Sequence, residues 1–146
     1  TVSRSGEVAL WKLATLSPVR RVFRPVQTQL PYRAVSIIQP TPDGRALLVG
    51  SGGDLVVLAL PGLETLEVLE FRLGGIEGLI LHPCSGQLVV TAGRELVFHR
   101  LGDPACNATH INLGSQVNSV TTSSGTLVAV GTDSGVVVLD VPWLTD

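Results

Sequence analysis

The stretch PTPDGRALLVGSGG, Pro40 to Gly53, places a turn rich in Pro, Asp and Gly directly before an apolar run. The same arrangement returns as HPCSGQLVVTAG, His82 to Gly93, and as SSGTLVAVGTDSG, Ser123 to Gly135. The glycines that anchor these turns lie 42 and 39 residues apart along the chain: Gly44, Gly86 and Gly125. A turn that recurs at such a spacing indicates a repeated supersecondary unit.

A second motif recurs with about the same period as this turn. Apolar runs such as SGEVALWKL, Ser5 to Leu13, recur with ends 47, 41 and 40 residues apart, at Leu13, Leu60, Leu101 and Val141. Two motifs that share a period of about 40 to 45 residues are typical of four-stranded propeller blades. We therefore expect an all-β fold, a partial β-propeller of four-stranded antiparallel blades with about three and a half blades present.

The chemistry of each period places its four strands. The first strands are expected at Val35–Gln39, Ile76–Leu81 and Val117–Thr122. The second strands are apolar almost continuously, which predicts burial on both faces; they are expected at Ala46–Val49, Leu88–Val90 and Leu127–Val130.

The third strands are the recurring apolar runs. They are expected at Val8–Leu13, Leu55–Leu60, Leu96–Leu101 and Val136–Val141. The fourth strands are more polar, as outer edge strands usually are; they are expected at Val19–Phe23, Leu66–Phe71 and His110–Leu113. Hydrophobicity that falls from the second strand to the fourth predicts a core that lies toward the propeller axis.

These motifs resemble the WD-repeat β-propeller family. SGEVALWKL is similar to the third strand of a WD-repeat blade, with Trp11-Lys12 in place of the Trp-Asp pair, and PTPDGRALLVGSG is similar to the SPDG-type turn and the strand after it. The repeats are degenerate, because the pair is replaced elsewhere by Leu58-Ala59, His99-Arg100 and Leu139-Asp140. Trp11 is expected to pack between blades.

Two other folds are alternatives, a propeller of another family and a β-sandwich, but a sandwich gives no reason for a fixed period. We expect one propeller segment over residues 1–146: the end of a blade at 1–24, blades at 33–73 and 75–113, and an incomplete blade at 116–146. The chain is expected to be a segment of a longer protein, since an open arc of blades would expose apolar sheet faces at both ends.

No catalytic pattern emerges. The three histidines, His82, His99 and His110, fall in a turn, a third strand and an outer strand, without the spacing of a metal or acid-base site. We predict no catalytic residue, metal, cofactor or small-molecule substrate. The two cysteines are too few for a disulfide framework, and no apolar run is long enough for a membrane span. An intracellular protein without membrane contact is therefore expected, in the cytoplasm, with the nucleus as the alternative.

Charge is unevenly distributed. Residues 1–45 carry seven basic and two acidic groups, whereas the remaining residues carry three basic and ten acidic groups. Arg20, Arg21 and Arg24 could form a basic rim patch for an acidic protein segment or a nucleic-acid backbone. The alternative is that these charges only protect an exposed edge strand from pairing with another strand.

The family resemblance implies a rigid scaffold that binds protein partners through two kinds of loop, those before the first strand and those between the second and third. These loops contain Arg4, Arg33, Glu77, Arg94, Gln116 and Asp133. We expect a non-catalytic protein-interaction scaffold within a larger intracellular multidomain protein. The alternative is a propeller that contributes to a nucleic-acid (ribonucleoprotein) complex through the basic rim patch.

Overall fold

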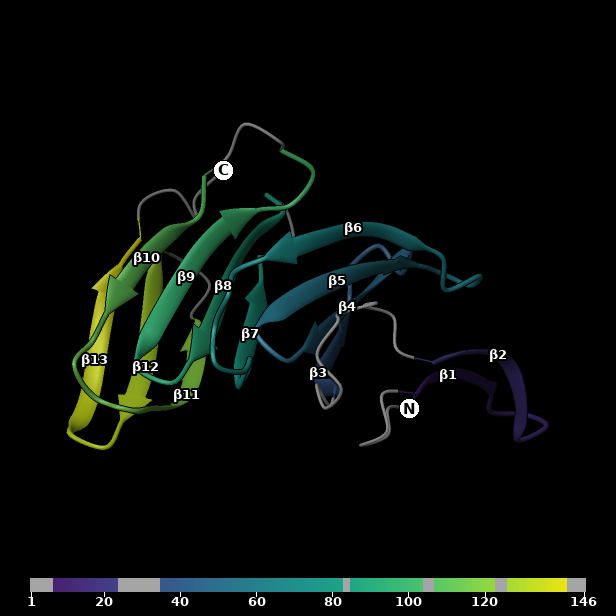
Figure 1. The fold of residues 1–146 in the computed structure, drawn as a ribbon, viewed down its shortest axis with the longest axis horizontal. Coiled ribbons are helices and arrows are strands. Elements are labelled where there is room, and N and C mark those ends of the chain that lie inside the picture. Colours follow the sequence, from purple (N-terminus) through teal and green to yellow (C-terminus); the bar gives the residue numbers. More distant parts are fainter. Residues whose placement is uncertain (1–6, 24–34, 83–84, 104–106, 123–125, 142–146) are drawn as a thin grey trace. The chain divides into compact units, whose positions relative to one another are not determined.

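A computed structural model of the chain describes residues 7–23, 35–82, 85–103, 107–122 and 126–141. This described part consists of strands β1 to β13 joined by turns and loops, without a helix (Figure 1). Among these residues, therefore, none belongs to a helix long and apolar enough to cross a membrane. The chain divides into two compact units, Thr1–Gly75 and Ile76–Asp146, each of which is described by itself.

The first unit contains two antiparallel sheets. The smaller pairs β1 (Glu7–Lys12) with β2 (Ser17–Phe23). The larger runs in the order β3 (Val35–Pro40), β4 (Ala46–Ser51), β5 (Asp54–Ala59), β6 (Thr65–Glu70).

The second unit also contains two antiparallel sheets. One has the order β7 (Gly78–Leu81), β8 (Gln87–Ala92), β9 (Glu95–Arg100), β10 (Thr109–Asn112), and the other has the order β11 (Val117–Thr122), β12 (Leu127–Thr132), β13 (Gly135–Asp140). Each strand overlaps the segment predicted from the repeats and takes its expected place in a sheet, so the all-β architecture of antiparallel blades is confirmed. That residues 1–146 form a single domain stays a prediction.

One backbone hydrogen bond recurs at equivalent positions of the repeats. In three sheets the residue that follows the third strand donates its N–H to the carbonyl of the residue just before the second strand. The bonds run from Leu60 to Arg45, from Leu101 to Gly86 and from Val141 to Thr126, at 2.8, 2.9 and 2.7 Å. Each bond satisfies backbone groups that have no partner in the strand ladder. Because the bond ties the turn before the second strand to the end of the third strand, both motifs recur with the same period in the sequence.

Two glycines of the opening stretch are required for different reasons. Gly44 has a φ of 68°, a left-handed conformation that side chains with a Cβ rarely adopt. Gly53 has no room for a side chain, because a Cβ there would overlap the carbonyl group of Leu73. The Gly53 carbonyl also accepts a hydrogen bond from the Leu73 N–H at 3.3 Å, so the two backbones approach closely.

Each unit has an apolar cluster between its two sheets. In the first unit Val8 of β1 joins the buried side chains of Val49, Val56 and Leu58 in the larger sheet and of Leu63 in the turn between β5 and β6. In the second unit the cluster combines side chains of β8 and β9 with those of the β11–β13 sheet: Val89, Leu96, Phe98, Val117, Val128, Val130 and Val141. Figure 1 shows these two sheets of the second unit side by side. Burial of such side chains stabilises the fold by about 1.5–3 kcal/mol each.

Burial follows the predicted gradient in two of the sheets. Every residue of β8 is buried, as is nearly every residue of β4, whereas the outer strands β6 and β10 alternate between exposed and half-buried residues. Burial of the second strand on both faces is therefore confirmed for β4 and β8.

The same expectation is wrong for β12. Val128 and Val130 are buried in the cluster, but Leu127 on the opposite face is 45% exposed. The neighbouring side chains on that face, Val136 and Val138 of β13, are 75% and 60% exposed. No sheet in the described part of the second unit covers this face.

The packing of Trp11 also differs from expectation, since the residue is 37% exposed. Val8 and Leu10 point to the cluster of the first unit, and strand alternation places Ala9 and Trp11 toward the other face. A β-bulge between Leu10 and Trp11 further shifts the pairing with β2.

Candidate protein-interaction face

Four of the six predicted partner-binding residues lie together in the second unit. Glu77 directly precedes β7, Arg94 lies in the turn between β8 and β9, Gln116 precedes β11, and Asp133 lies in the turn between β12 and β13. Because antiparallel strands reverse direction, the start of a first strand and the turn between second and third strands share one end of a sheet. We call these four residues, with the neighbours Ser115, Asn118 and Ser134, the loop face.

Hydrogen bonds connect the loop face across the two sheets. The Gln116 Nε2 donates to the Glu77 Oε2 at 2.9 Å, which joins the segment before β11 to the segment before β7. The Gln116 carbonyl accepts the Asp133 N–H at 3.0 Å. The Asn118 Nδ2 donates to the Asp133 Oδ1 at 2.7 Å. Residues 39 positions apart in sequence are thereby held in one polar network.

The remaining loop-face residues are fixed by shorter links. Ser134 Oγ donates to Ser115 Oγ at 2.8 Å. The Arg94 carbonyl accepts the Leu113 N–H at 2.9 Å, and the carbonyl of the adjacent Gly93 accepts the Val117 N–H at 2.7 Å. These backbone bonds fix the turn, and the Arg94 side chain is exposed.

The loop face is polar and carries exposed charges. The carboxylates of Glu77 and Asp133 are exposed and accept hydrogen bonds from neutral amides, which do not cancel their charge. A carboxylate offers about four acceptor positions, so each can accept further bonds from a cationic or N–H group. Arg94 adds one exposed cation.

Ser115, Asn118 and Ser134 were not singled out from the sequence. Ser134 could have been found from the repeat register, since it follows Arg94 by 40 residues. Asn118 carried a weaker signal, as a polar residue next to the apolar Val117 in a predicted first strand. Their hydrogen bonds join the start of β11 to the turn between β12 and β13, within one sheet.

The other predicted positions are described in part or not at all. Arg4, Arg33 and Arg24 lie outside the described residues. Arg20 is exposed in β2, opposite Leu10 of β1. Arg21 also belongs to β2, but only its backbone position is described. The basic rim patch of Arg20, Arg21 and Arg24 therefore stays a prediction.

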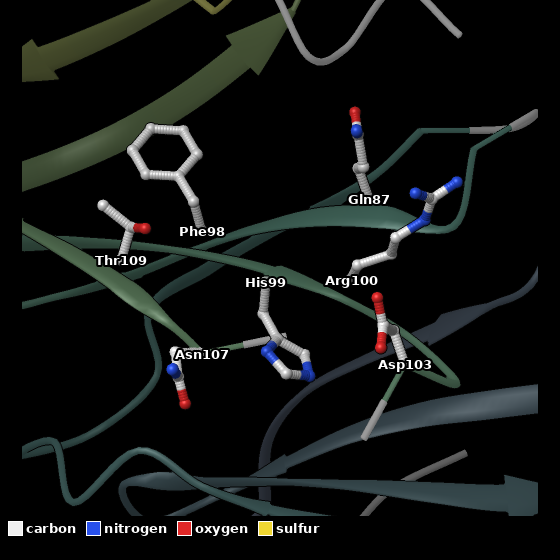
Figure 2. A pocket seen from close by; sticks show the side chains of 7 residues that line it. All are labelled: Gln87, Phe98, His99, Arg100, Asp103, Asn107 and Thr109. Carbon is white, nitrogen blue, oxygen red and sulfur yellow. The ribbon is translucent and has the colours of Figure 1, made fainter. Parts of the chain in front are cut away.

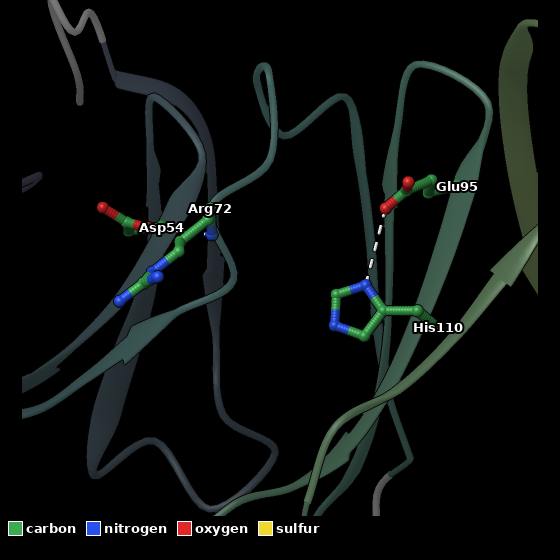
Figure 3. Close-up of polar contacts among 4 residues, drawn as sticks. All are labelled: Asp54, Arg72, Glu95 and His110. Carbon is green, nitrogen blue, oxygen red and sulfur yellow. Dashed lines mark hydrogen bonds and ion pairs between the residues drawn. The ribbon is translucent and has the colours of Figure 1, made fainter.

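Two further polar contacts stabilise strand ends (Figure 3). His110 Nδ1 of β10 lies 3.4 Å from Glu95 Oε2 of β9, with both side chains about 40% exposed. A polar contact so exposed contributes at most about 1 kcal/mol. In the first unit, the Arg72 N–H donates to the Oδ1 of the buried Asp54 at 3.4 Å, which ties the end of the larger sheet to the start of β5.

The second unit also contains a pocket of about 360 Å³ (Figure 2). Its described lining comes from β8, β9, the segment between β9 and β10, and the start of β10: Gln87, Phe98, His99, Arg100, Asp103, Asn107 and Thr109. Phe98 and His99 are adjacent in β9 and project to opposite sides. Gln87 is 8% exposed, and no described group within reach forms a hydrogen bond with its Oε1. No feature of the sequence predicted this pocket.

No joint site is predicted for His82, His99 and His110, and the structure places them in three different segments. His82 lies 3.0 Å from Ser85 in a turn, His99 is buried in β9, and His110 is in β10. Within the described residues, no group of three or more His, Cys, Asp and Glu side chains could hold a metal ion.

Comparison with known proteins identifies the fold. No family model and no curated protein sequence matches this chain. Among solved structures, the RRP9 WD40 repeats align with a TM-score of 0.82 and 13% sequence identity. The alignment covers 99% of this chain and 44% of the RRP9 chain. The Cps50 (Swd1) β-propeller domain of Myceliophteria thermophila aligns with a TM-score of 0.78 and 17% sequence identity. The alignment covers 97% of this chain and 47% of the Cps50 chain.

A third structure has a different kind of name. The dihydro-heme d1 dehydrogenase NirN, in complex with DHE, aligns over 96% of this chain and 31% of its own, with a TM-score of 0.70 and 20% identity. The chain thus spans less than half the length of each of the three similar structures. At these identities the likeness concerns the fold and not the activity. The chain has the fold of a WD-repeat β-propeller, and its antiparallel sheets correspond to propeller blades.

Proposed function

We propose that this chain is part of a non-catalytic, cytoplasmic scaffold that binds other proteins through the loop face of its second unit. The observation that carries this proposal is the Glu77–Gln116–Asp133–Asn118 network. It holds two exposed carboxylates from separate segments, Glu77 and Asp133, in one arrangement with the amide side chains at the start of β11. A preorganised surface loses little conformational entropy when a partner binds, and binding residues commonly lie on loops that a rigid scaffold positions.

The fold alone does not decide between a scaffold and an enzyme, because one of the similar structures is named a dehydrogenase. The scaffold is favoured by the composition of the loop face, which contains carboxylates, amides, serine hydroxyls and an arginine.

The test is affinity capture with matched variants. The first variant combines Glu77→Gln with Asp133→Asn, which removes both charges from the loop face while it keeps side-chain size. The matched control combines Glu64→Gln with Asp140→Asn, two exposed carboxylates outside the loop face. Quantitative mass spectrometry of captured proteins should show partners that the first variant loses and that the control retains. Identical partner sets for the two variants would contradict the proposal.

The second candidate function is nucleic-acid binding through the basic rim patch. The exposed side chains of Arg20 in β2 and Lys12 at the end of β1 favour it. Binding to a phosphate backbone weakens steeply as salt is raised. A salt-dependent affinity for single-stranded RNA that Arg20→Ala reduces would support this function over the first.

A further inference from the structure

The hairpin of β1 and β2 presents an exposed serine next to a proline. Ser17 and Pro18 begin β2, and Arg20 follows three residues after Ser17. Every residue from Trp11 to Arg20 is exposed. The Ser17 hydroxyl lies 2.6 Å from the hydroxyl of Thr15, which belongs to the exposed turn before β2. The serine oxygen is therefore accessible from solvent.

The backbone around Ser17 is weakly held. Arg20 pairs with Leu10 and Pro18 pairs with Trp11, so Val19 is the extra residue of a β-bulge. Pro18 has no N–H to donate to the ladder. Leu16, just before the serine, has a φ of 51°, a left-handed conformation that is unfavourable for leucine. Among the described strands β2 pairs with β1 alone, so its other edge is open.

These features match the needs of one class of enzyme. A kinase groove binds its substrate in an extended conformation, which β2 already has and which the residue before a proline favours. Some kinase grooves offer no hydrogen-bond partner to the backbone N–H of the residue that follows the phosphorylated serine. Such a groove selects proline at that position, because any other residue would have an unsatisfied N–H donor there. We propose that Ser17 is a phosphorylation site for a serine/threonine kinase that selects proline directly after the acceptor and a basic side chain three residues after it.

The reaction is a phosphoryl transfer from ATP. The Ser17 Oγ forms a bond to the γ-phosphorus, the bond from that phosphorus to the ADP oxygen breaks, and the hydroxyl proton passes to the catalytic carboxylate of the kinase. Phosphoserine and ADP are the products, and no oxidant or reductant is needed.

Phosphorylation would change the charge of this end of the hairpin. Ser17 pairs with Lys12 across the strands, so the two side chains lie on the same face of the sheet. A phosphate adds about −1.5 to −2 charges at neutral pH. It would offset Lys12 and Arg20, the described cations of the hairpin, and so weaken attraction to an anionic partner.

The chain contains a natural comparison site. Thr41 is also followed by a proline, Pro42, but Gly44 stands three residues after it in place of a basic residue. The Thr41 hydroxyl donates to Asp43 Oδ1 at 2.6 Å, and its oxygen accepts the Ala46 N–H at 3.0 Å. Thr41 is half-buried. The same kinase is expected to leave this threonine unmodified.

The test uses the whole 146-residue chain, a purified proline-directed kinase of the cyclin-dependent class and Mg-ATP. Tandem mass spectrometry should locate the phosphate on Ser17 and not on Thr41. Pro18→Ala and Arg20→Ala should each lower kcat/KM by about tenfold or more, equivalent to roughly 1.4 kcal/mol. Ser17→Ala should abolish the transfer.

A synthetic peptide of residues 11–24, with the same substitutions, separates recognition from folding. Unchanged rates for Pro18→Ala in both chain and peptide would overturn the proposal. So would transfer to the peptide without transfer to the folded chain, because the hairpin would then block the kinase. Equal phosphorylation of Thr41 and Ser17 in the folded chain would also contradict it.

Discussion

Single side chains shape the turn before β4. The Thr41 hydroxyl donates to Asp43 Oδ1 at 2.6 Å, and the Arg45 N–H donates to the same oxygen at 3.1 Å. Both bonds favour the ionised carboxyl, so the pKa of Asp43 lies below its ordinary value, with the threonine bond the larger cause. In the turn before β8, a contact of 3.0 Å between His82 Nδ1 and Ser85 Oγ takes the corresponding place.

This carboxylate predicts a pH-dependent stability. Since the pKa of Asp43 is lower in the folded chain, its contribution is present above the unfolded pKa of about 3.9 and is lost as pH falls through the folded pKa. Asp43→Asn should therefore lower the thermal midpoint near neutral pH, and the difference from wild type should vanish in strong acid. Titration by NMR should show the Asp43 pKa rising toward its ordinary value in Thr41→Val. An ordinary pKa in the wild-type chain would contradict the expectation.

At the level of elements, the inner and outer strands of a sheet contribute unequally to stability. Leu58 of β5 is 0% exposed and belongs to the cluster of the first unit. Leu66 of β6, the neighbouring strand of the same sheet, is 63% exposed. The difference follows from position, because β6 is the outermost strand of this sheet and presents much of its surface to solvent.

The two leucines provide a matched test. Leu58→Ala should destabilise the chain by about 2–5 kcal/mol, because the cavity it leaves is only partly filled by relaxation. Leu66→Ala makes the same chemical change at an exposed site and should alter stability by at most about 0.5 kcal/mol. Urea unfolding followed by circular dichroism measures both. Similar losses for the two variants would mean that β6 is as buried as β5 in solution.

At the level of the whole molecule, an apolar sheet face is left exposed. Leu127, Val136 and Val138 share one face of the β11–β13 sheet, and no described sheet of the second unit covers it. The sequence had predicted uncovered apolar faces for an open set of blades. Such a patch favours association in water.

We therefore expect the chain to self-associate as its concentration rises. Val136→Thr combined with Val138→Thr should weaken this association, since threonine keeps a high β-propensity and adds a polar hydroxyl. Light scattering after size-exclusion chromatography over a range of concentrations measures the effect. Val130→Thr is the control, because Val130 is buried and its substitution should lower stability instead. A wild-type chain that remains monomeric at all concentrations would contradict the prediction.

The fold could be predicted further than the site. The turn at Pro40 to Gly53 and its copies specify strand order, because glycine at a left-handed turn and continuous apolar runs are local properties. The register of loops also placed Glu77, Arg94, Gln116 and Asp133 at one end of the sheets. The partner of each side chain could not be predicted, since a hydrogen bond such as Gln116 to Glu77 depends on the distance between two sheets.

The sequence by itself thus determined the repeat, the order of strands within each sheet and the sites of the turns, all of which follow from local periodicity and turn chemistry. Only the tertiary structure decided which faces are covered and which polar groups meet. It buried one face of β12 and exposed the other, turned Trp11 away from the cluster of the first unit, and joined the loop face into a network. These outcomes depend on the packing of one sheet against another, which alternation within a single strand does not specify.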